Sequence, residues 1–397
     1  MRTNFSAEFL ATTAGARANE ILRSCVHCGF CNATCPTYQL TGNELDGPRG
    51  RIYLISELLE TGANKQRATQ HLDGCLTCRA CETTCPSGVA YAELAEIARE
   101  HIGFSRPGLQ GLLRRLLVWM VPVPGRLRAM ARLGSLFRWF VPKRLGKNLP
   151  QSIGRGLTAT SQHSRRVLLL NGCAQQVNAA ATNEHLAQLL DGHEIGAMTL
   201  AEEVCCGSMD LHLGDSEGAL AYMRRNVDTF FPLLGEVEAI ISSASGCGVT
   251  CKDYGRLLAH DPLYAHRAAA VAAKIVDVSE YLLAQDLNFA ATHEGQKVAW
   301  HSPCTLQHGQ QLSGGVEKLL TNAGYELTSV PDAHLCCGSA GPYSILQPRM
   351  SDQLKANKLA ALLSDSPDVV ATANVGCQTH IASDSPISVV HWIELLK

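Results

Sequence analysis

The stretch that decides the fold of the N-terminal region reads CVHCGFCNATCP at residues 25–36, and it returns as CLTCRACETTCP at residues 75–86. Each copy spaces its cysteines C-x2-C-x2-C-x3-C and places a proline directly after the fourth. The first run comprises Cys25, Cys28, Cys31 and Cys35, and the second comprises Cys75, Cys78, Cys81 and Cys85. This spacing is the ligand pattern of paired 4Fe-4S clusters.

In that pattern the fourth cysteine of each run binds the cluster of the other run. We therefore assign Cys25, Cys28, Cys31 and Cys85 to one cluster, and Cys75, Cys78, Cys81 and Cys35 to the other. Two zinc sites are the alternative, but structural zinc usually takes separated C-x2-4-C pairs. The residues around the runs, such as 18–22 and 51–59, have apolar positions at helical spacing. Residues 1–104 are predicted to form a helical ferredoxin-type domain.

Composition places the chain among ordinary globular proteins. It has 397 residues, 46% of them hydrophobic and 18% charged, which is enough for two or three domains with their own cores. The seventeen cysteines are an odd number and fall in metal-type motifs, which favours a reducing compartment. The first residues lack the basic and apolar regions of a secretory signal, and no apolar run is long enough to span a bilayer. We expect a cytoplasmic location.

A basic segment follows the ferredoxin-type domain. Between His101 and Asn183 there are thirteen lysines and arginines and no acidic residue, although the whole chain has a net charge of −2. Residues 109–121 and 127–141 read as two amphipathic helices, separated by prolines. Arginines among leucines and tryptophans are typical of helices that lie on anionic membranes, and residues 106–147 are a candidate for such contact. An acidic partner subunit, or plain packing between domains, would give the same pattern, whereas nucleic acid is disfavoured.

The C-terminal half contains an internal duplication. Its cysteines recur with a spacing of 131, 131, 131 and 130 residues, and both copies contain the tetrapeptide CCGS. The first set is Cys173, Cys205, Cys206 and Cys247, and the second is Cys304, Cys336, Cys337 and Cys377. We predict a connector over residues 105–160, a first cysteine-rich (CCG) unit over 161–290 and a second over 291–397.

Apolar runs precede these cysteines and helix-like segments follow them, which predicts an α/β unit with a mainly parallel sheet. The runs lie at residues 167–170, 239–241, 298–300 and 369–371. Such sheets hold ligands at the carboxyl ends of their strands, so the four cysteines of each unit should converge at one rim. The overall class is therefore α+β and multidomain: an α-helical two-cluster domain followed by a duplicated α/β unit.

These further cysteines are predicted to hold a metal or another iron-sulfur centre. Buried cysteines can also act as small apolar residues, but eight doing so at repeated positions is improbable. The copies differ, since Cys251 follows Cys247 in the first and His380 follows Cys377 in the second. The second also gathers His301, His308 and His334, and histidine can bind iron or carry a proton.

Several catalytic signatures are missing from the sequence. There is no G-x-G-x-x-G after a strand, no phosphate-binding G-x-x-x-x-G-K-[ST] and no hydrolase triad motif. Oxidation of a hydroxy compound removes two electrons together and needs a flavin or a nicotinamide, whereas iron-sulfur centres pass electrons singly. No residue of this chain is assigned a catalytic role, and the substrate chemistry is expected on a partner.

The strings CVHCGFCNATCPTYQLTGNELDGPRGRIYLI, CLTCRACETTCPSGVAY, HSPCTLQH, HLCCGSAGPY and NVGCQTHI resemble the iron-sulfur subunits of bacterial glycolate oxidase (glycolate dehydrogenase). The similarity covers residues 24–397, with the basic segment only loosely matched. It implies two 4Fe-4S clusters on the eight N-terminal cysteines. In the related heterodisulfide reductase subunits each cluster-binding CCG unit ends in C-x-x-C, which neither copy has here, so those cysteines carry over only as candidates.

The resemblance also implies partners: an FAD-binding dehydrogenase subunit that oxidises glycolate to glyoxylate, a second flavoprotein-like subunit, and a quinone or another electron acceptor at the cytoplasmic face of the membrane. Two alternatives stay open. The chain could serve a lactate or glycerol-3-phosphate dehydrogenase in the same way. It could also be a structural or redox-sensing module whose clusters do not turn over.

Overall fold

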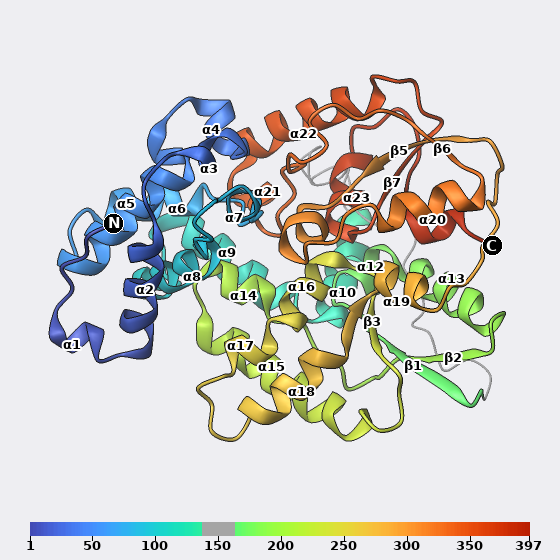
Figure 1. Ribbon diagram of the computed structural model, residues 1–397, viewed down its shortest axis with the longest axis horizontal. Helices are drawn as coiled ribbons and strands as arrows, with labels where there is room; N and C mark the ends of the chain where they lie inside the picture. The colour runs from blue at the N-terminus through green and yellow to red at the C-terminus, as the bar shows by residue number, and fades with distance from the viewer. Residues whose placement is uncertain (137–162) are drawn as a thin grey trace.

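The structure is a computed structural model that describes residues 1–136 and 163–397. Its N-terminal part is helical and lies at the left of Figure 1. The elements are α1 Ala7–Leu10, α2 Thr13–Ser24, α3 Phe30–Ala33, α4 Pro36–Thr41, η1 Glu44–Asp46, α5 Pro48–Thr61, α6 Lys65–Asp73, α7 Ala80–Thr83 and α8 Tyr91–Ile102. The two helices predicted from apolar spacing are present as α2 and α5, and both are longer than the segments from which they were predicted.

Local sequence explains how the two cysteine runs fold alike. Each run forms a loop and then one short helix, α3 or α7, which starts after a left-handed residue: Gly29 at φ 88° and Arg79 at φ 60°. Pro36 then opens α4, since a proline at the first helical position loses no hydrogen bond. Helix α5 likewise starts at Pro48 and ends at a left-handed Gly62. The helices thus present the cysteines from loops and helix starts.

The first cysteine-rich unit contains a four-stranded parallel sheet with the order β2-β1-β3-β4. Its strands are β1 Arg165–Leu169, β2 Ile195–Met198, β3 Ile240–Ser242 and β4 Ile275–Asp277. Its helices are α12 Gln175–Asn178, α13 Ala180–Asp191, α14 Ser208–Leu213, α15 Ser216–Phe230, η2 Phe231–Leu233, α16 Ser245–Lys252, α17 Tyr254–Leu257, α18 Ala265–Lys274 and α19 Val278–Ala284.

The second unit repeats this topology with the order β6-β5-β7-β8, again all parallel. Its strands are β5 Lys297–His301, β6 Glu326–Leu327, β7 Val369–Thr372 and β8 Val389–His391. Its helices are the π-helical turn η3 Thr305–Gly309, α20 Gly315–Ala323, α21 Tyr343–Leu346, α22 Pro348–Leu363, α23 Val375–Ala382 and the 3-10 turn η4 Trp392–Leu395. The predicted duplication and the α+β class with parallel sheets are confirmed.

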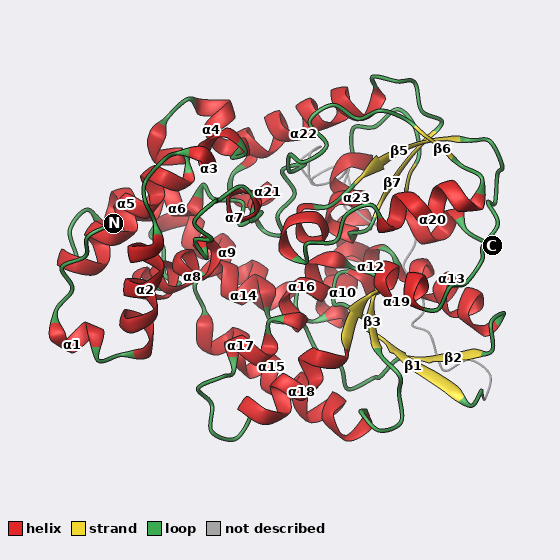
Figure 2. Cartoon of the chain, viewed as in Figure 1, coloured by secondary structure: helices red, strands yellow, loops and turns green. Residues whose placement is uncertain are grey.

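The two sheets, drawn as yellow arrows in Figure 2, share one apolar core. Side chains of the first unit such as Leu169 and Leu186 lie in the same buried cluster as Trp300 and Trp392 of the second. Polar contacts also cross between the units: His391 contacts the Ser243 carbonyl at 2.7 Å, and Thr182 donates to Glu394 at 2.6 Å. Burying a joint apolar face in this way holds the two units as one body.

The connector forms α9 Gly108–Met120 and α10 Pro124–Leu136. The second helix therefore starts three residues before the predicted 127, because Pro124 serves as a helix start rather than a breaker. Residues 137–162, including the rest of that predicted helix and Lys143, Arg144 and Lys147, lie outside the described part of the chain. Among the described helices, none combines the length and the hydropathy needed to cross a bilayer.

Candidate metal centres

The first group of thiols gathers at the outer end of the ferredoxin-type domain. Cys25, Cys28, Cys31 and Cys85 all line one hollow, which Cys81 also borders. Burial raises the pKa of Cys31, and its neighbours Cys25 and Cys85 raise it further, to about 11. Cys28 is exposed whereas Cys25 is buried, so one side of this group faces solvent. The structure thus brings together three cysteines of the first run and the last cysteine of the second.

The second group lies deeper in the molecule. Cys35, Cys75, Cys78 and Cys81 line a separate hollow. Cys35 comes from the start of α4, and the other three come from the loop and short helix of the second run. Both groups of four are those that the crossed pattern pairs. Their role as cluster ligands remains a prediction.

The cysteines of the first CCG unit meet at the carboxyl ends of β1, β2 and β3, as the α/β pattern predicts. Cys173 Sγ donates to Cys205 Sγ at 3.6 Å. Hydrogen bonds from Cys205 and Cys247 hold the pKa of Cys206 well below its ordinary value despite its burial. Cys251 is also buried here, one helical turn after Cys247 on α16.

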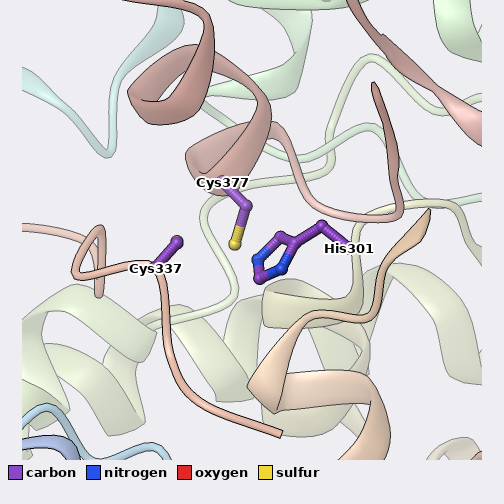
Figure 3. A group of neighbouring side chains, drawn as sticks. All are labelled: His301, Cys337 and Cys377. Carbon is purple, nitrogen blue, oxygen red and sulfur yellow. The ribbon is translucent and has the colours of Figure 1, made fainter. Parts of the chain in front are cut away.

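The second unit gathers its cysteines at the corresponding rim of β5, β6 and β7. Cys304 Sγ donates to Cys336 Sγ at 3.8 Å. The sulfur atoms of Cys337 and Cys377 and a ring nitrogen of His301 all lie within 4.8 Å of one another (Figure 3). Burial holds the pKa of His301 well below its ordinary value, so its imidazole is neutral.

The second thiol group of the ferredoxin-type domain touches the second CCG unit. Cys78, Cys304 and Cys336 lie in one apolar cluster. Burial raises the pKa of Cys78, and nearby Cys304 and Cys35 raise it further. Tyr343 donates to the carbonyl oxygen of Gly74 at 3.3 Å across the same junction. Thiols far apart in the sequence are therefore neighbours here.

The first unit meets the ferredoxin-type domain through charged side chains instead. Arg79 donates to Asp253 at 2.7 Å, and Arg256 contacts Glu96 at 3.1 Å. Among the described residues, no cysteine of the ferredoxin-type domain shares an apolar cluster with the cysteines of the first unit. The two units are thus connected differently to the N-terminal cysteines.

Comparison with known proteins finds related families for both cysteine-rich parts of the chain. A family model described as a 4Fe-4S dicluster domain matches residues 21–89, and one described as a cysteine-rich domain matches residues 167–252 and 298–382. The glycolate oxidase iron-sulfur subunit of Escherichia coli is 46% identical over the whole of this chain and 98% of its own length. The chain belongs to the family of glycolate oxidase iron-sulfur subunits.

Two further similarities are weaker. Lactate utilization protein A of Bacillus licheniformis is 27% identical over 49% of this chain and 83% of its own length. A crystal structure of a hypothetical protein from Helicobacter pylori superposes with a TM-score of 0.59 over 98% of this chain and 72% of that one. Its sequence identity is 7%, so this likeness concerns the fold alone.

As a member of this family the chain is an iron-sulfur subunit of an oxidoreductase complex, which implies other subunits. The donor atoms fit such centres, because soft thiolates are the ligands that iron-sulfur clusters select. In the N-terminal domain one hollow is lined by five cysteines and the other by four, with Cys81 at both, and a further four cysteines meet in each CCG unit.

The sequence did not predict which polar residues lie against the second thiol group. Arg51 is buried, donates to Thr37 at 3.1 Å and to the His71 carbonyl at 2.8 Å, and lies beside Cys35. Burial alone would raise the pKa of Cys75, but Arg51 and Arg99 outweigh it and lower the pKa. A signal was present in the string GPRGRIYLI, where an arginine interrupts the apolar face of a helix.

The histidines of the second unit differ in their contacts. His308 contacts Thr83 Oγ1 at 2.9 Å and the His334 carbonyl at 3.0 Å. His380, which follows Cys377 in the sequence, contacts Ser351 Oγ at 3.2 Å and lies outside the group formed by His301, Cys337 and Cys377. His301 is the histidine that lies among thiols.

Proposed function

We propose that this chain relays electrons from an FAD-binding subunit, which oxidises glycolate to glyoxylate, toward a membrane quinone. The single observation that carries the proposal is that Cys78 lies in one apolar cluster with Cys304 and Cys336. Iron-sulfur centres supply one-electron transfer steps when they are bound. Thiols that share one cluster across the domain junction would place such centres near one another.

The ligands we propose are Cys25, Cys28, Cys31 and Cys85 for the outer 4Fe-4S cluster, and Cys35, Cys75, Cys78 and Cys81 for the inner one. Cys173, Cys205, Cys206 and Cys247 are candidates for a further centre in the first CCG unit, and Cys304, Cys336, Cys337 and Cys377 for one in the second. The domain boundaries 1–104, 105–160, 161–290 and 291–397 belong to the same proposal. The described strands of each sheet fall within one of the last two ranges.

The first thiol group, which would hold the outer cluster and is called the outer thiol group below, lies beside a surface suited to a partner subunit. Val26 and Phe30 flank the exposed Cys28, and their side chains are 71% and 63% exposed. Tyr53 on α5 is exposed as well. Apolar and aromatic residues are enriched where partners bind. We assign this face to the FAD-binding subunit, with a second flavoprotein-like subunit completing the complex.

Helix α9 supports contact with an anionic membrane on the cytoplasmic face. Leu109, Leu112, Leu116 and Trp119 follow helical spacing and are all exposed. Arg115 on the same helix is exposed too, and Arg126 stacks on the Trp119 ring at 4.6 Å.

Two other arginines of the basic segment, Arg106 and Arg114, are not available for lipid, because both pair with Asp73. The membrane face is therefore narrower than the basic segment read from sequence.

Affinity purification of the tagged chain from its own host tests the proposal. We expect a flavoprotein to co-purify, and deletion of the chain to abolish glycolate-dependent quinone reduction in membranes. Co-purification without FAD, or quinone reduction that survives the deletion, would contradict it. The alternative of a lactate-oxidising complex predicts loss of lactate-dependent reduction instead, and only 27% identity over half of the chain supports that relation.

A further inference from the structure

His301 is buried without satisfying its own polar atoms. It is the last residue of β5, and its side chain is 2% exposed. Neither Nδ1 nor Nε2 has a hydrogen-bond partner among the residues that the structure describes. A buried polar group without a partner is costly and calls for an explanation, such as a bound ion.

The residues around this imidazole suggest an explanation for its unpartnered nitrogen atoms. Sγ of Cys337, Sγ of Cys377 and a ring nitrogen of His301 lie within 4.8 Å of one another, and all three residues are buried. Figure 3 shows the ring facing the sulfur of Cys377. We propose that the second CCG unit holds a metal centre bound by the imidazole of His301 together with the thiolates of Cys337 and Cys377.

Other histidines nearby show what an ordinary structural role looks like. His391, at the end of β8, is also buried, but its Nε2 contacts the Ser243 carbonyl at 2.7 Å and its Nδ1 accepts from Ile393 at 3.2 Å. His308 has a partner at each nitrogen as well. His301 differs from both, because the sulfur atoms of Cys337 and Cys377 lie close enough to bind an ion with it.

The first CCG unit provides an internal comparison. The position 131 residues before His301 is Leu170, which is buried and packs with Cys205 and Cys206. The duplication therefore keeps the cysteines and replaces an apolar side chain with an imidazole in one copy only. The two units would hold different centres, one with thiolates alone and one with mixed thiolate and imidazole ligation.

A buried cation supports an anionic centre in the second unit. Lys358 on α22 is 3% exposed and lies near Cys336, Cys337 and Cys377 as well as the carboxyl group of Asp332. Its ammonium donates to the Asp332 carbonyl at 2.9 Å. A lysine is rarely buried without negative charge nearby, and metal-bound thiolates would add to that of Asp332.

The ligand chemistry narrows the metal to zinc or iron. Soft thiolates with imidazole suit both, whereas magnesium and calcium prefer oxygen. The remaining ligand positions would be open to Cys304, Cys336 or inorganic sulfide. The proposal does not depend on which substrate the complex oxidises, so it can fail while the proposed function stands.

Metal analysis and X-ray absorption at the zinc and iron edges test it on the full chain purified without oxygen. For zinc we expect nitrogen at about 2.0–2.1 Å and sulfur at about 2.3 Å from the metal. For iron we expect hyperfine coupling to a histidine nitrogen in pulsed EPR of the reduced protein. The variant His301→Leu, which restores the residue of the first unit, should lose this nitrogen signal and bind less of the same metal.

His308→Leu is the matched control, since it removes a neighbouring histidine that already has partners, and it should keep both the metal and the nitrogen signal. The iron of the N-terminal domain should be unchanged in both variants, which shows that they fold. A wild-type spectrum without a nitrogen ligand at either metal, or a nitrogen signal that persists in His301→Leu, would overturn the proposal.

Discussion

The guanidinium of Arg51 lies 3.9 Å from Sγ of Cys35, on the buried side of the inner thiol group. Burial raises the pKa of Cys75, but the positive charge of Arg51 acts against this effect and lowers that pKa. A positive charge at this place stabilises the more negative, reduced state of any centre bound there. The charge of Arg51, which lies on α5, should therefore raise the reduction potential of the proposed inner cluster.

Replacing Arg51 with methionine should lower the reduction potential of the inner cluster. A unit charge a few ångströms away acts with roughly 3 kcal/mol at an effective dielectric near 20, which is on the order of 100 mV for one electron. Arg51→Lys keeps the charge and should restore most of the potential. An EPR-monitored redox titration measures both. Equal potentials in Arg51→Met and the wild type would show that the charge does not act on the cluster.

The crossed assignment of cysteines makes a paired prediction. Cys28→Ser and Cys85→Ser come from different runs but should remove the same outer cluster, because both residues line one hollow. Cys35→Ser and Cys78→Ser should remove the inner one. In each variant the EPR signal of one cluster should disappear. The iron content of the N-terminal domain should fall from about eight atoms to about four. Loss of different signals in Cys28→Ser and Cys85→Ser would contradict the crossed pattern.

Asp73 should make the stability of the chain depend on pH. It pairs with Arg106 at 2.9 Å and Arg114 at 2.8 Å, and these arginines outweigh burial and hold its pKa below the ordinary value. A carboxyl with a lowered folded-state pKa stabilises the protein above its unfolded pKa of about 4, and this contribution is lost as the pH falls through the lower folded value.

Asp73→Asn should therefore reduce the free energy of unfolding by about 3 kcal/mol at neutral pH, since it leaves the guanidinium groups of Arg106 and Arg114 without their carboxylate partner. The difference from the wild type should shrink below about pH 4. Chemical denaturation across pH measures it. Glu20→Gln is the control, because its partner Arg17 and Glu20 itself are exposed. A difference for Asp73→Asn that does not vary with pH would contradict the ion-pair explanation.

Exposed residues of α9 should determine binding to anionic vesicles. The double variant Leu112→Ser and Trp119→Ser removes two of the exposed apolar side chains while it leaves the buried Leu117 and Arg114 in place. We expect it to sediment at least tenfold less with vesicles that contain phosphatidylglycerol. Leu263→Ser changes an equally exposed apolar residue in another part of the chain and should have no effect. Unchanged sedimentation of the double variant would remove α9 from the membrane face.

The sequence predicted those parts of the fold that repeat or follow a local period. The alternation of strands and helices, the duplication and the convergence of Cys173, Cys205 and Cys247 at one rim are confirmed, because the carboxyl ends of parallel strands meet at one edge. The start of α10 at Pro124 was missed, since a proline can either end or open a helix.

What could not be predicted depends on contacts between distant segments. No local period shows that Cys78 lies beside Cys304, or that Arg51 faces Cys35, since such neighbours are fixed by how the domains pack. His301 was noticed only as one histidine of several near the cysteines. Its distinction, two buried nitrogens without a partner among the described residues, exists only in three dimensions.

Substrate reduction of the purified complex tests the central claim most directly. The oxidised complex, kept without oxygen, is mixed with glycolate, lactate or glycerol 3-phosphate and frozen for EPR. The relay proposed here predicts that glycolate, within turnover time, produces the signals of reduced 4Fe-4S clusters, and that Cys28→Ser and Cys78→Ser each remove one of them. Clusters that stay oxidised with glycolate, while dithionite reduces them, would contradict it.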